Sequence, residues 1–342
     1  MDLRHVNNHI PDEYIGYEDW RIFKNFLTED GWLYKFDLSS GYHHLDVHED
    51  SQKKLGFSWD FQGKTRYFVF TVLPFGLKSA PRIFTKTLRP LSAYWKNLGI
   101  QIAIYLDDGG GTEKEFSTTV NHVTTVKETL IKAGFVVNQE KSVLEPTQNL
   151  TWLGVTVDTT KNILYVSDKR INKCQHYITH SLLSSPYTTA RKLAKFVGMI
   201  ISMKFVIGDI VNLKTRFCYQ LIESRIAWDS PIKLFVNNEA IDEVFFWKHN
   251  LSNLNVKHIK ADNRINDILV HSDASNNALG VVLNNDKACH RNLNDEERGE
   301  SSTYRELLAV VYGLQVFQSD FQGKKIEWFV DNYPTTAIVH CI

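Results

Sequence analysis

The sequence predicts an α+β chain with two or three domains, and three observations support this prediction. Up to about residue 166, stretches with the β-branched or alternating pattern of strands are interspersed with stretches whose apolar residues recur at helical spacing. Between about 168 and 252 the pattern is mainly helical. A polar stretch at 253–266 then precedes a new segment of mixed pattern, so the clearest domain boundary is expected near residue 264.

The elements of the first part follow from local signals. Strand patterns occupy residues 32–37, 66–72, 100–106, 152–155 and 163–166. Asp107-Asp108-Gly109 directly follows the third of these strands and is a tight-turn signal. One helix is expected to begin at Ser79-Ala80-Pro81, with the serine as candidate cap and the proline near the first helical position. A second helix, over Val120–Leu130, is expected to stop at Gly134.

The composition argues against several classes of protein. Hydrophobic residues make up 43% of the chain and charged residues 23%, as in globular proteins, and no apolar run reaches the length of a membrane span. The N-terminus carries no signal-peptide pattern. The cysteines lack CxxC spacing, which argues against a zinc site and a disulfide framework and favours a reduced, intracellular compartment. They are Cys174, Cys218, Cys289 and Cys341.

Charge is unevenly distributed, although the formal net charge is zero. Between Val166 and Ala227 there are ten Lys and Arg residues against three acidic residues. A basic region in a neutral protein is typical of a nucleic-acid-binding face. A solvated helical surface is the alternative interpretation.

Carboxylates stand at the ends of two expected strands. Asp37 ends the first strand, and Asp107 and Asp108 follow the strand at 100–106. Three carboxylates from two neighbouring strands can hold two divalent cations about 3.5–4 Å apart, the arrangement used in nucleotidyl transfer, and such hard oxygen ligands favour magnesium. Taken separately, an Asp-Asp-Gly turn and an aspartate before Ser39-Ser40 are more often structural, as a turn and a helix cap.

Five motifs in order resemble those of reverse transcriptases. They are Phe36–His44 (motif A), Leu73–Pro81 (motif B), Tyr105–Asp108 (motif C), Gly134–Lys141 (motif D) and Leu150–Val157 (the primer-grip motif E). The resemblance implies a right-hand polymerase fold with a fingers remnant, a palm and a helical thumb. It also implies an RNA-directed DNA polymerase, a nucleotidyltransferase that uses two Mg²⁺ ions per active site, with Mn²⁺ as an alternative.

The same resemblance implies roles for single residues in catalysis. Asp37, Asp107 and Asp108 would be the catalytic metal ligands. Lys141 would protonate the leaving pyrophosphate, with an ordinary surface charge as the alternative. Tyr42 would occupy the place of a ribose 2′-hydroxyl and so exclude ribonucleotides.

Further residues would bind the nucleotide. Phe75 and Gly76 would lie along the nucleotide pocket and the template, with a core aromatic as the alternative for Phe75. Asp2–Asn7 resembles the end of a fingers motif, in which Arg4 would contact the triphosphate. The basic fingers residues expected before it are absent, which puts the activity of the fragment in question.

Several details resemble DIRS-like retroelements more than retroviruses. Gly109-Gly110-Gly111 follows the aspartate pair, and the segments Leu88–Leu91, Ala194–Gly198 and Thr215-Arg216 fit the same group. We therefore expect the reverse transcriptase and ribonuclease H region of a retroelement polyprotein of DIRS-like type.

A second set of acidic residues follows the polar stretch. Asp273 lies on a strand pattern, Glu306 opens a helical pattern, and Asp331 ends another strand. This series resembles ribonuclease H, in which these three residues would be metal ligands for hydrolysis of the RNA strand of a hybrid. Because the sequence ends 11 residues after Asp331, without the fourth acidic ligand, we expect a truncated and inactive domain.

The resemblances imply a domain plan and a set of partners. The expected domains are fingers remnant and palm at 1–160, helical thumb at 161–228, tether at 229–264 and truncated ribonuclease H-like α/β domain at 265–342. The partners would be an RNA template, a DNA primer, RNA–DNA hybrid and deoxynucleoside triphosphates. Alternatives are a decayed or domesticated fragment that binds nucleic acid without catalysis, a DNA-templated polymerase or terminal transferase, and a metal phosphohydrolase.

Overall fold

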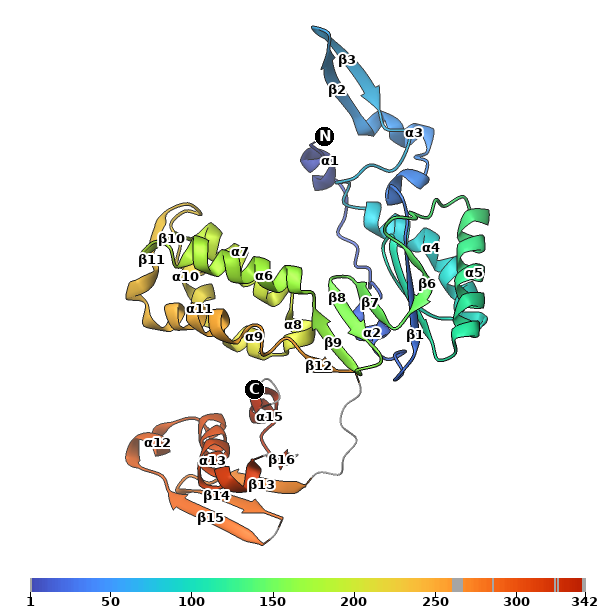
Figure 1. Cartoon of the computed structure of the whole chain (residues 1–342). Coiled ribbons are helices and arrows are strands. Elements are labelled where there is room, and N and C mark those ends of the chain that lie inside the picture. The colour runs from blue at the N-terminus through green and yellow to red at the C-terminus, as the bar shows by residue number, and fades with distance from the viewer. Residues whose placement is uncertain (1, 260–266, 285, 323, 325, 340–342) are drawn as a thin grey trace. The chain divides into compact units, whose positions relative to one another are not determined.

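The structure is a computed structural model that describes residues 2–259, 267–284, 286–322, 324 and 326–339 (Figure 1). The chain divides into two compact units. Unit 1 comprises the residues up to Ile171 together with Asn255–Ile259, and unit 2 comprises Asn172–Leu254 and the residues after Ile259. Along the described residues, no helix has both the length and the apolar character that crossing a bilayer requires.

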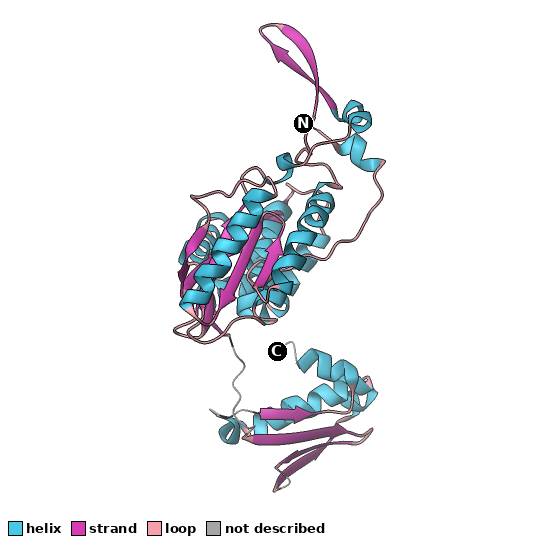
Figure 2. Ribbon diagram, turned by 90° about the vertical axis from the view of Figure 1, so that its right-hand side faces the viewer, coloured by secondary structure: helices cyan, strands magenta, loops and turns pink. Residues whose placement is uncertain are grey.

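An antiparallel sheet with the strand order β4-β5-β1-β6 lies at the centre of unit 1. Its strands are β1 (Trp32–Asp37), β4 (Gln101–Tyr105), β5 (Asp108–Glu113) and β6 (Val143–Thr147). Two long helices, α4 (Ala80–Asn97) and α5 (Phe116–Lys132), pack against this sheet (Figures 1 and 2). The strands expected at 32–37 and 100–106 and both expected helices are confirmed.

The two helices begin and end close to the sequence signals. Pro81 lies in the first turn of α4, and Ser79 is its N-cap residue, although the Ser79 side chain accepts no capping hydrogen bond. The chain leaves α5 through Gly134, whose φ of 87° is a conformation that glycine adopts without steric cost.

The main core of unit 1 fills the space between this sheet and the two helices. Alternate residues of β1 and β4 point toward the helices, and residues of α4 at helical spacing meet them. Burial of each large side chain contributes roughly 1.5–3 kcal/mol. The buried residues are Tyr34, Phe36, Leu38, Phe84, Leu88, Trp95, Ile100, Ile102, Ile104, Val123, Val126, Leu130, Phe135 and Val137.

A second antiparallel sheet of unit 1 has the order β12-β9-β8-β7. Its strands are β7 (Asn149–Trp152), β8 (Val155–Asp158), β9 (Ile163–Val166) and β12 (Lys257–His258). The continuous strand expected at 152–155 is wrong, because Leu153 and Gly154 form the turn between β7 and β8 with φ of 43° and 78°. Positive φ at both central residues matches the twist of the flanking strands. The strand expected at 163–166 is confirmed.

The remaining elements of unit 1 are short helices and an isolated ribbon. They are α1 (Arg4–Asn8), α2 (Trp20–Phe23), the 3₁₀ helices η1 (Gly41–His44) and η2 (Lys53–Leu55), α3 (Glu49–Gln52), β2 (Gly56–Phe61) and β3 (Lys64–Val69). Among the strands that the structure describes, β2 and β3 pair only with each other, and they project from the rest of unit 1 (Figures 1 and 2). The strand expected at 66–72 is thus found in part, as β3.

The first part of unit 2 is mainly helical, as its sequence pattern predicts. Its elements are α6 (Asp168–Tyr177, which begins in unit 1), the π-helix η3 (Ile178–Leu182), α7 (Ala190–Ile201), α8 (Lys204–Ile207), α9 (Ile210–Leu213), α10 (Arg216–Glu223), η4 (Leu234–Val236), α11 (Asn238–Asn250) and the strand pair β10 (Tyr187–Thr189) and β11 (Pro231–Lys233). Thr189 caps α7 by accepting a hydrogen bond from the Lys192 amide.

The segment 229–264, expected as a tether, is folded over much of its length. α11 packs on α10, and the buried carboxylate of Glu243 accepts hydrogen bonds from the amides of Phe217 (3.0 Å) and Cys218 (2.9 Å). These amides belong to the first turn of α10, whose N-cap Thr215 provides no side-chain cap. The residues of the tether from 260 to 264 lie outside the described residues, and the domain bounds themselves stay a prediction.

The C-terminal part of unit 2 is a mixed sheet with the order β15-β14-β13-β16. Its elements are β13 (Ile268–Ala274), β14 (Ala278–Leu283), β15 (Lys287–Asn292), α12 (Asp295–Gly299), α13 (Ser302–Val316), α14 (Gln318–Phe321), β16 (Ile326–Phe329) and α15 (Tyr333–Val339). β13 pairs antiparallel with β14 and parallel with β16, and α13 covers one face of the sheet. Of the four cysteines, Cys341 lies outside the described residues, and the other three form no disulfide.

Candidate active site

The first set of carboxylates meets at one end of the central sheet of unit 1. Asp37, the last residue of β1, is the cross-strand partner of Asp108, the first residue of β5. The charge of Asp37 acts on the carboxyl groups of both Asp107 and Asp108. The Leu38 amide also donates to the Asp107 carbonyl at 3.0 Å, which ties the end of β1 to the turn. The fold thus brings residue 37 next to the aspartate pair, and a metal site shared by the three residues stays a prediction.

The turn of the β4–β5 hairpin lies earlier than the sequence signal suggests. Tyr105 pairs with Asp108, so the two turn residues are Leu106 and Asp107, and Asp108 already belongs to β5. Leu106 has φ of 56°, a conformation that costs a residue with a Cβ atom roughly 1–2 kcal/mol. Strain of this kind is concentrated at functional sites, and here it stands next to Asp107.

Three glycines allow the strand after the aspartates to lie close to its neighbours. A Cβ atom on Gly109 would come within 3.0 Å of the Phe36 ring, and a Cβ on Gly111 would meet the Tyr34 ring equally closely. Gly110 faces the opposite side of the sheet, where its Cβ would lie 3.1 Å from the indole of Trp152. The glycine run that followed motif C in the sequence thus has a packing function.

The environment of Asp107 and Asp108 disfavours the ionisation of these two residues when no cation is bound. Burial, followed by the charges of Asp37 and Asp107, raises the pKa of Asp108 to about 6. Burial and the charge of Asp37 likewise raise the pKa of Asp107. Like charges held together in a half-buried site are relieved by a cation of higher charge, so these residues fit divalent metal ions.

Lys141 lies beside this set, as motif D suggests. Its Nζ is 3.8 Å from Oδ1 of Asp37, and its side chain is exposed. Two residues that the sequence gave no reason to select hold the backbone of Asp37 in place. Ser142 Oγ accepts a hydrogen bond from the Asp37 amide at 3.0 Å, and the Asn138 amide donates to the Asp37 carbonyl at 2.8 Å. Their positions around Lys141 are the only sequence signal that could have indicated them.

Tyr42 is a residue of η1 and lies close to Asp107. Its ring contacts Phe75 (centroids 5.0 Å apart) and Phe84 (5.4 Å). Burial and the charge of Asp107 raise the pKa of Tyr42. Phe75 is 57% exposed, so it is not a core aromatic, and its ring covers part of the Tyr42 ring.

The other two nucleotide-binding candidates lie in the N-terminal part of unit 1. Gly76 has φ of 90°, and its carbonyl accepts a hydrogen bond from the Asn7 side chain at 2.9 Å. Arg4 pairs with Asp2 at 2.6 Å and is highly exposed. A cavity of about 720 Å³ opens nearby, between α1 and α3, and Asp37, Asp107 and Asp108 are not among its lining residues.

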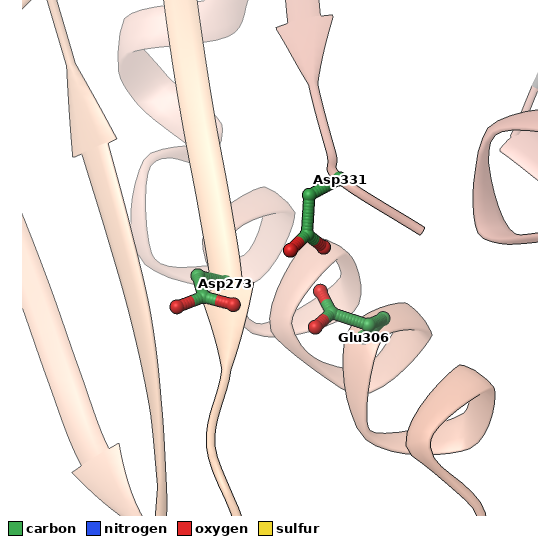
Figure 3. A group of neighbouring side chains, drawn as sticks. All are labelled: Asp273, Glu306 and Asp331. Atoms are coloured by element: carbon green, nitrogen blue, oxygen red, sulfur yellow. The ribbon is translucent and has the colours of Figure 1, made fainter. Parts of the chain in front are cut away.

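The second set of carboxylates converges in the C-terminal part of unit 2 (Figure 3). Asp273 lies on β13, Glu306 on α13, and Asp331 just after β16. Carboxylate oxygens of the three residues lie within 4.8 Å of one another. Among the described residues this is the one such group, since Asp37, Asp107 and Asp108 do not all approach one another so closely.

Glu306 is the buried member of this second set. One of its oxygens accepts a hydrogen bond from the Ala274 amide at 3.2 Å, and the other, Oε2, is buried without a hydrogen-bond partner. Burial raises the pKa of Glu306, against the effect of the Ala274 amide, and the charges of Asp331 and Asp273 add to the rise. An orphaned buried oxygen among three acids fits a bound divalent cation.

Several basic side chains of the segment 166–227 are engaged in contacts within the protein. Arg191 pairs with Asp229 (2.7 Å), Lys204 with Asp209 (2.8 Å), and Arg170 donates to the Gly154 carbonyl (2.8 Å). Lys195 lies over the ring of Tyr177. Part of the positive charge therefore stabilises the fold, and only the remainder is free for a polyanion.

Comparison with known protein families assigns both parts of the chain. Residues 1–157 match the family described as "Reverse transcriptase (RNA-dependent DNA polymerase)", and residues 264–340 match "RNase H-like domain found in reverse transcriptase". The chain is 28% identical over 360 aligned positions to the Pol polyprotein of transposon opus and 26% identical over 353 to that of transposon gypsy, both from Drosophila melanogaster. These alignments cover 98% and 99% of this chain but 33% and 32% of the relatives, so the chain spans about a third of their length.

Solved structures show the same fold. The foamy viral protease–reverse transcriptase in complex with double-stranded DNA aligns with a TM-score of 0.62 and 19% identity over 98% of this chain and 56% of that one. The foamy viral protein in complex with an RNA/DNA hybrid aligns with a TM-score of 0.60 over 99% and 44% of the two chains. The DIRS-like subtype stays a prediction, since these comparisons do not test it. The α+β polymerase fold is confirmed, and the chain belongs to the reverse transcriptase and ribonuclease H-like region of retroelement polyproteins.

Proposed function

We propose that this chain is the catalytic region of an RNA-directed DNA polymerase, with its active site at Asp37, Asp107 and Asp108. The observation that supports this best is the pairing of Asp37 with Asp108 across β1 and β5, with Asp107 on the strained turn beside them. The reverse transcriptase family match over residues 1–157 includes all three aspartates. The proposed partners are an RNA template, a DNA primer and deoxynucleoside triphosphates.

The three aspartates would hold two Mg²⁺ ions. Bound there, the ions would supply the positive charge that activates a primer 3′-hydroxyl and stabilises the leaving pyrophosphate. The protein side chains would position the incoming nucleotide and select deoxyribonucleotides over ribonucleotides. The Tyr42 ring, in contact with the exposed Phe75, would occupy the space of a 2′-hydroxyl. Lys141, beside Asp37, would hold a proton for the pyrophosphate, and Phe75 and Gly76 would face the nucleotide and template.

Arg4 and the second set of carboxylates are given more limited roles than the first set. Arg4 would reach a triphosphate only by leaving its ion pair with Asp2. Asp273, Glu306 and Asp331 would bind a divalent cation, but we propose that hydrolysis of an RNA–DNA hybrid is weak or absent. In support, the sheet face beside the triad exposes Leu269 and Phe329, of which Phe329 borders the pocket that Asp273 and Asp331 line.

Primer extension on an RNA template tests the polymerase proposal. The expected result is Mg²⁺-dependent extension that Asp107→Asn and Asp108→Asn each abolish while nucleic-acid binding is kept. Asp30→Asn is a matched control with the same change of charge. Asp30 is exposed, and its φ of 56° suits asparagine. Full extension by either active-site variant would refute the metal-ligand assignment. Binding without extension by the natural chain would instead favour a non-catalytic nucleic-acid-binding fragment.

A further inference from the structure

We propose that one face of the β2–β3 ribbon is a docking platform for unpaired nucleotides of a single-stranded nucleic acid. Residues opposite each other in an antiparallel pair point to the same side, and successive residues alternate. The register therefore gathers Phe57, Trp59, Phe61, Lys64, Arg66 and Phe68 on one side, which we call the platform face. The proposal rests on the proposed polymerase function and adds to it how the unpaired part of a template would be held.

On the platform face, the two cations of β3 lie opposite rings of β2, and a third cross-strand pair consists of two rings. Phe57 and Phe68 form a stacked pair with centroids 5.5 Å apart and planes inclined by 25°. Further toward the tip of the ribbon, Trp59 lies opposite Arg66, and the Arg66 guanidinium is 5.4 Å from the centroid of the Phe61 ring. Flat rings interleaved with cations are the surface on which successive bases of a single strand stack while their phosphates are neutralised.

The platform face is open to solvent over its outer half. Trp59 is 64% exposed and Phe61 is 48% exposed. A lone two-stranded ribbon is at best marginally stable in water, and β2 and β3 pair with no other strand in the described part of the chain. Exposed aromatic rings on such a ribbon are typical of a surface that a ligand covers.

The positive charge of the platform face favours a polyanion as its ligand. Lys64 and Arg66 form no ion pair with any described residue. The acidic residue of the ribbon, Asp60, lies on the opposite side, where its carboxylate accepts a hydrogen bond from Thr65 at 2.6 Å. A second copy of the ribbon would bring the same cations against each other, whereas a phosphodiester backbone complements them.

The opposite side of the ribbon offers a matched control. It carries Tyr67, which is 83% exposed, next to Ser58 and Asp60. Tyr67→Ala therefore removes an aromatic ring from the same ribbon without changing the platform face. Trp59→Phe keeps a ring on the platform face and tests whether stacking, rather than the tryptophan itself, is required.

The experiment measures binding of the whole chain to a labelled single-stranded oligo(rU) and to a blunt RNA–DNA duplex by fluorescence anisotropy at fixed salt. Loss of one stacking contact should weaken single-strand binding roughly five- to fifty-fold in Trp59→Ala. Arg66→Ala should weaken it and lower its salt dependence, whereas Trp59→Phe and Tyr67→Ala should stay within about two-fold of the natural chain. Binding to the blunt duplex should change in none of the variants.

Three outcomes would overturn the proposal that the platform face binds single-stranded nucleic acid. They are unchanged single-strand binding in Trp59→Ala, an equal loss in Tyr67→Ala, and a concentration-dependent dimer that Trp59→Ala abolishes while oligonucleotide binding persists. The binding assay does not require catalysis. Failure of primer extension would therefore refute the proposed function without affecting this result, and intact extension with failed single-strand binding would refute the platform alone.

Discussion

Gly109 of β5 lies directly against the ring of Phe36, its cross-strand partner on β1, with no room between them for a Cβ atom. This contact sets the distance between the strand that ends in Asp37 and the strand that begins with Asp108. The glycine after the aspartate pair is therefore part of the geometry of the site.

Gly109→Ala should destabilise unit 1 and weaken primer extension. Overpacking a well-filled core costs about 1–3 kcal/mol, and the strands would have to move apart where the carboxylates meet. Gly198→Ala is the control and should stabilise the protein slightly, because alanine favours the helix more than glycine does. Gly198 is an exposed position of α7, where a Cβ meets nothing within 4 Å. Urea denaturation and extension rates check both variants, and a neutral Gly109→Ala would show that β5 is free to shift.

Asp108→Asn should stabilise the metal-free protein at neutral pH. The folded-state pKa of Asp108, about 6, lies above its ordinary value of 3.8, so the ionised side chain opposes folding above pH 6. The expected gain is on the order of 1–2 kcal/mol at pH 7.5 in EDTA, and it should shrink as the pH falls through 6 toward 4, where the natural residue becomes protonated in the folded state.

Hydrogen exchange of the β1 and β5 amides at several pH values measures this gain locally. Asp30→Asn, measured in the same way, is the control for loss of a carboxylate elsewhere in unit 1. A loss of stability in Asp108→Asn, or a gain that does not change with pH, would mean that the carboxylates do not repel one another as the structure implies.

Glu243→Ala should destabilise the helical part of unit 2 by about 2–3 kcal/mol. The substitution leaves the amides of Phe217 and Cys218 without their acceptor at the start of α10. Asp242→Ala, one residue earlier on the exposed side of α11, should change stability by less than about 0.5 kcal/mol. Equal effects of the two substitutions in thermal denaturation would argue against the capping role of Glu243.

Tyr42→Val should admit ribonucleotides, and Tyr42→Phe should not. The ring of Tyr42, in contact with Phe75 and Phe84, is the part expected to exclude a 2′-hydroxyl, and phenylalanine keeps that ring. The ratio of ribonucleotide to deoxyribonucleotide incorporation in primer extension measures the effect. An unchanged ratio in Tyr42→Val would assign the exclusion to another residue.

The second triad should bind Mn²⁺ without supporting efficient cleavage of an RNA–DNA hybrid. Binding should be lost in Glu306→Gln, because Glu306 supplies the buried oxygen that has no hydrogen-bond partner. A hybrid-cleavage assay with Mg²⁺ tests the second half of the prediction. Robust cleavage that Asp331→Asn abolishes would show that the expectation of inactivity is wrong while the ligand assignment holds.

Much of the fold and of the two carboxylate sets could be predicted from local patterns. Pro81 and Gly134 marked helix ends because caps and turns depend on a few neighbouring residues. Both acidic sets were found because their acids lie on or next to expected strands and a helix start, in series that resemble known families. The turn was expected one residue too late, at Asp107-Asp108-Gly109 instead of Leu106-Asp107. Its positive φ falls on Leu106, and a leucine gives no turn signal.

Features that depend on tertiary contacts could not be read from the sequence. Glu243 looks like any surface acid on a helix until α10 is placed beside it, 25 residues away in sequence. Ser142 and Asn138 hold Asp37 through backbone hydrogen bonds that no side-chain pattern reports. The aromatic platform of β2–β3 was missed because only the cross-strand register brings Trp59 and Arg66 to one side.

Iron-mediated cleavage of the protein backbone tests most directly whether residues 37, 107 and 108 hold a cation jointly. Fe²⁺ bound in place of Mg²⁺ generates hydroxyl radicals in the presence of ascorbate and peroxide, and these cut the chain next to the metal. We expect cuts at both 36–41 and 105–109, and Asp37→Asn should remove the two together. Cuts confined to one segment, or cuts at 105–109 that persist in Asp37→Asn, would contradict a shared metal site.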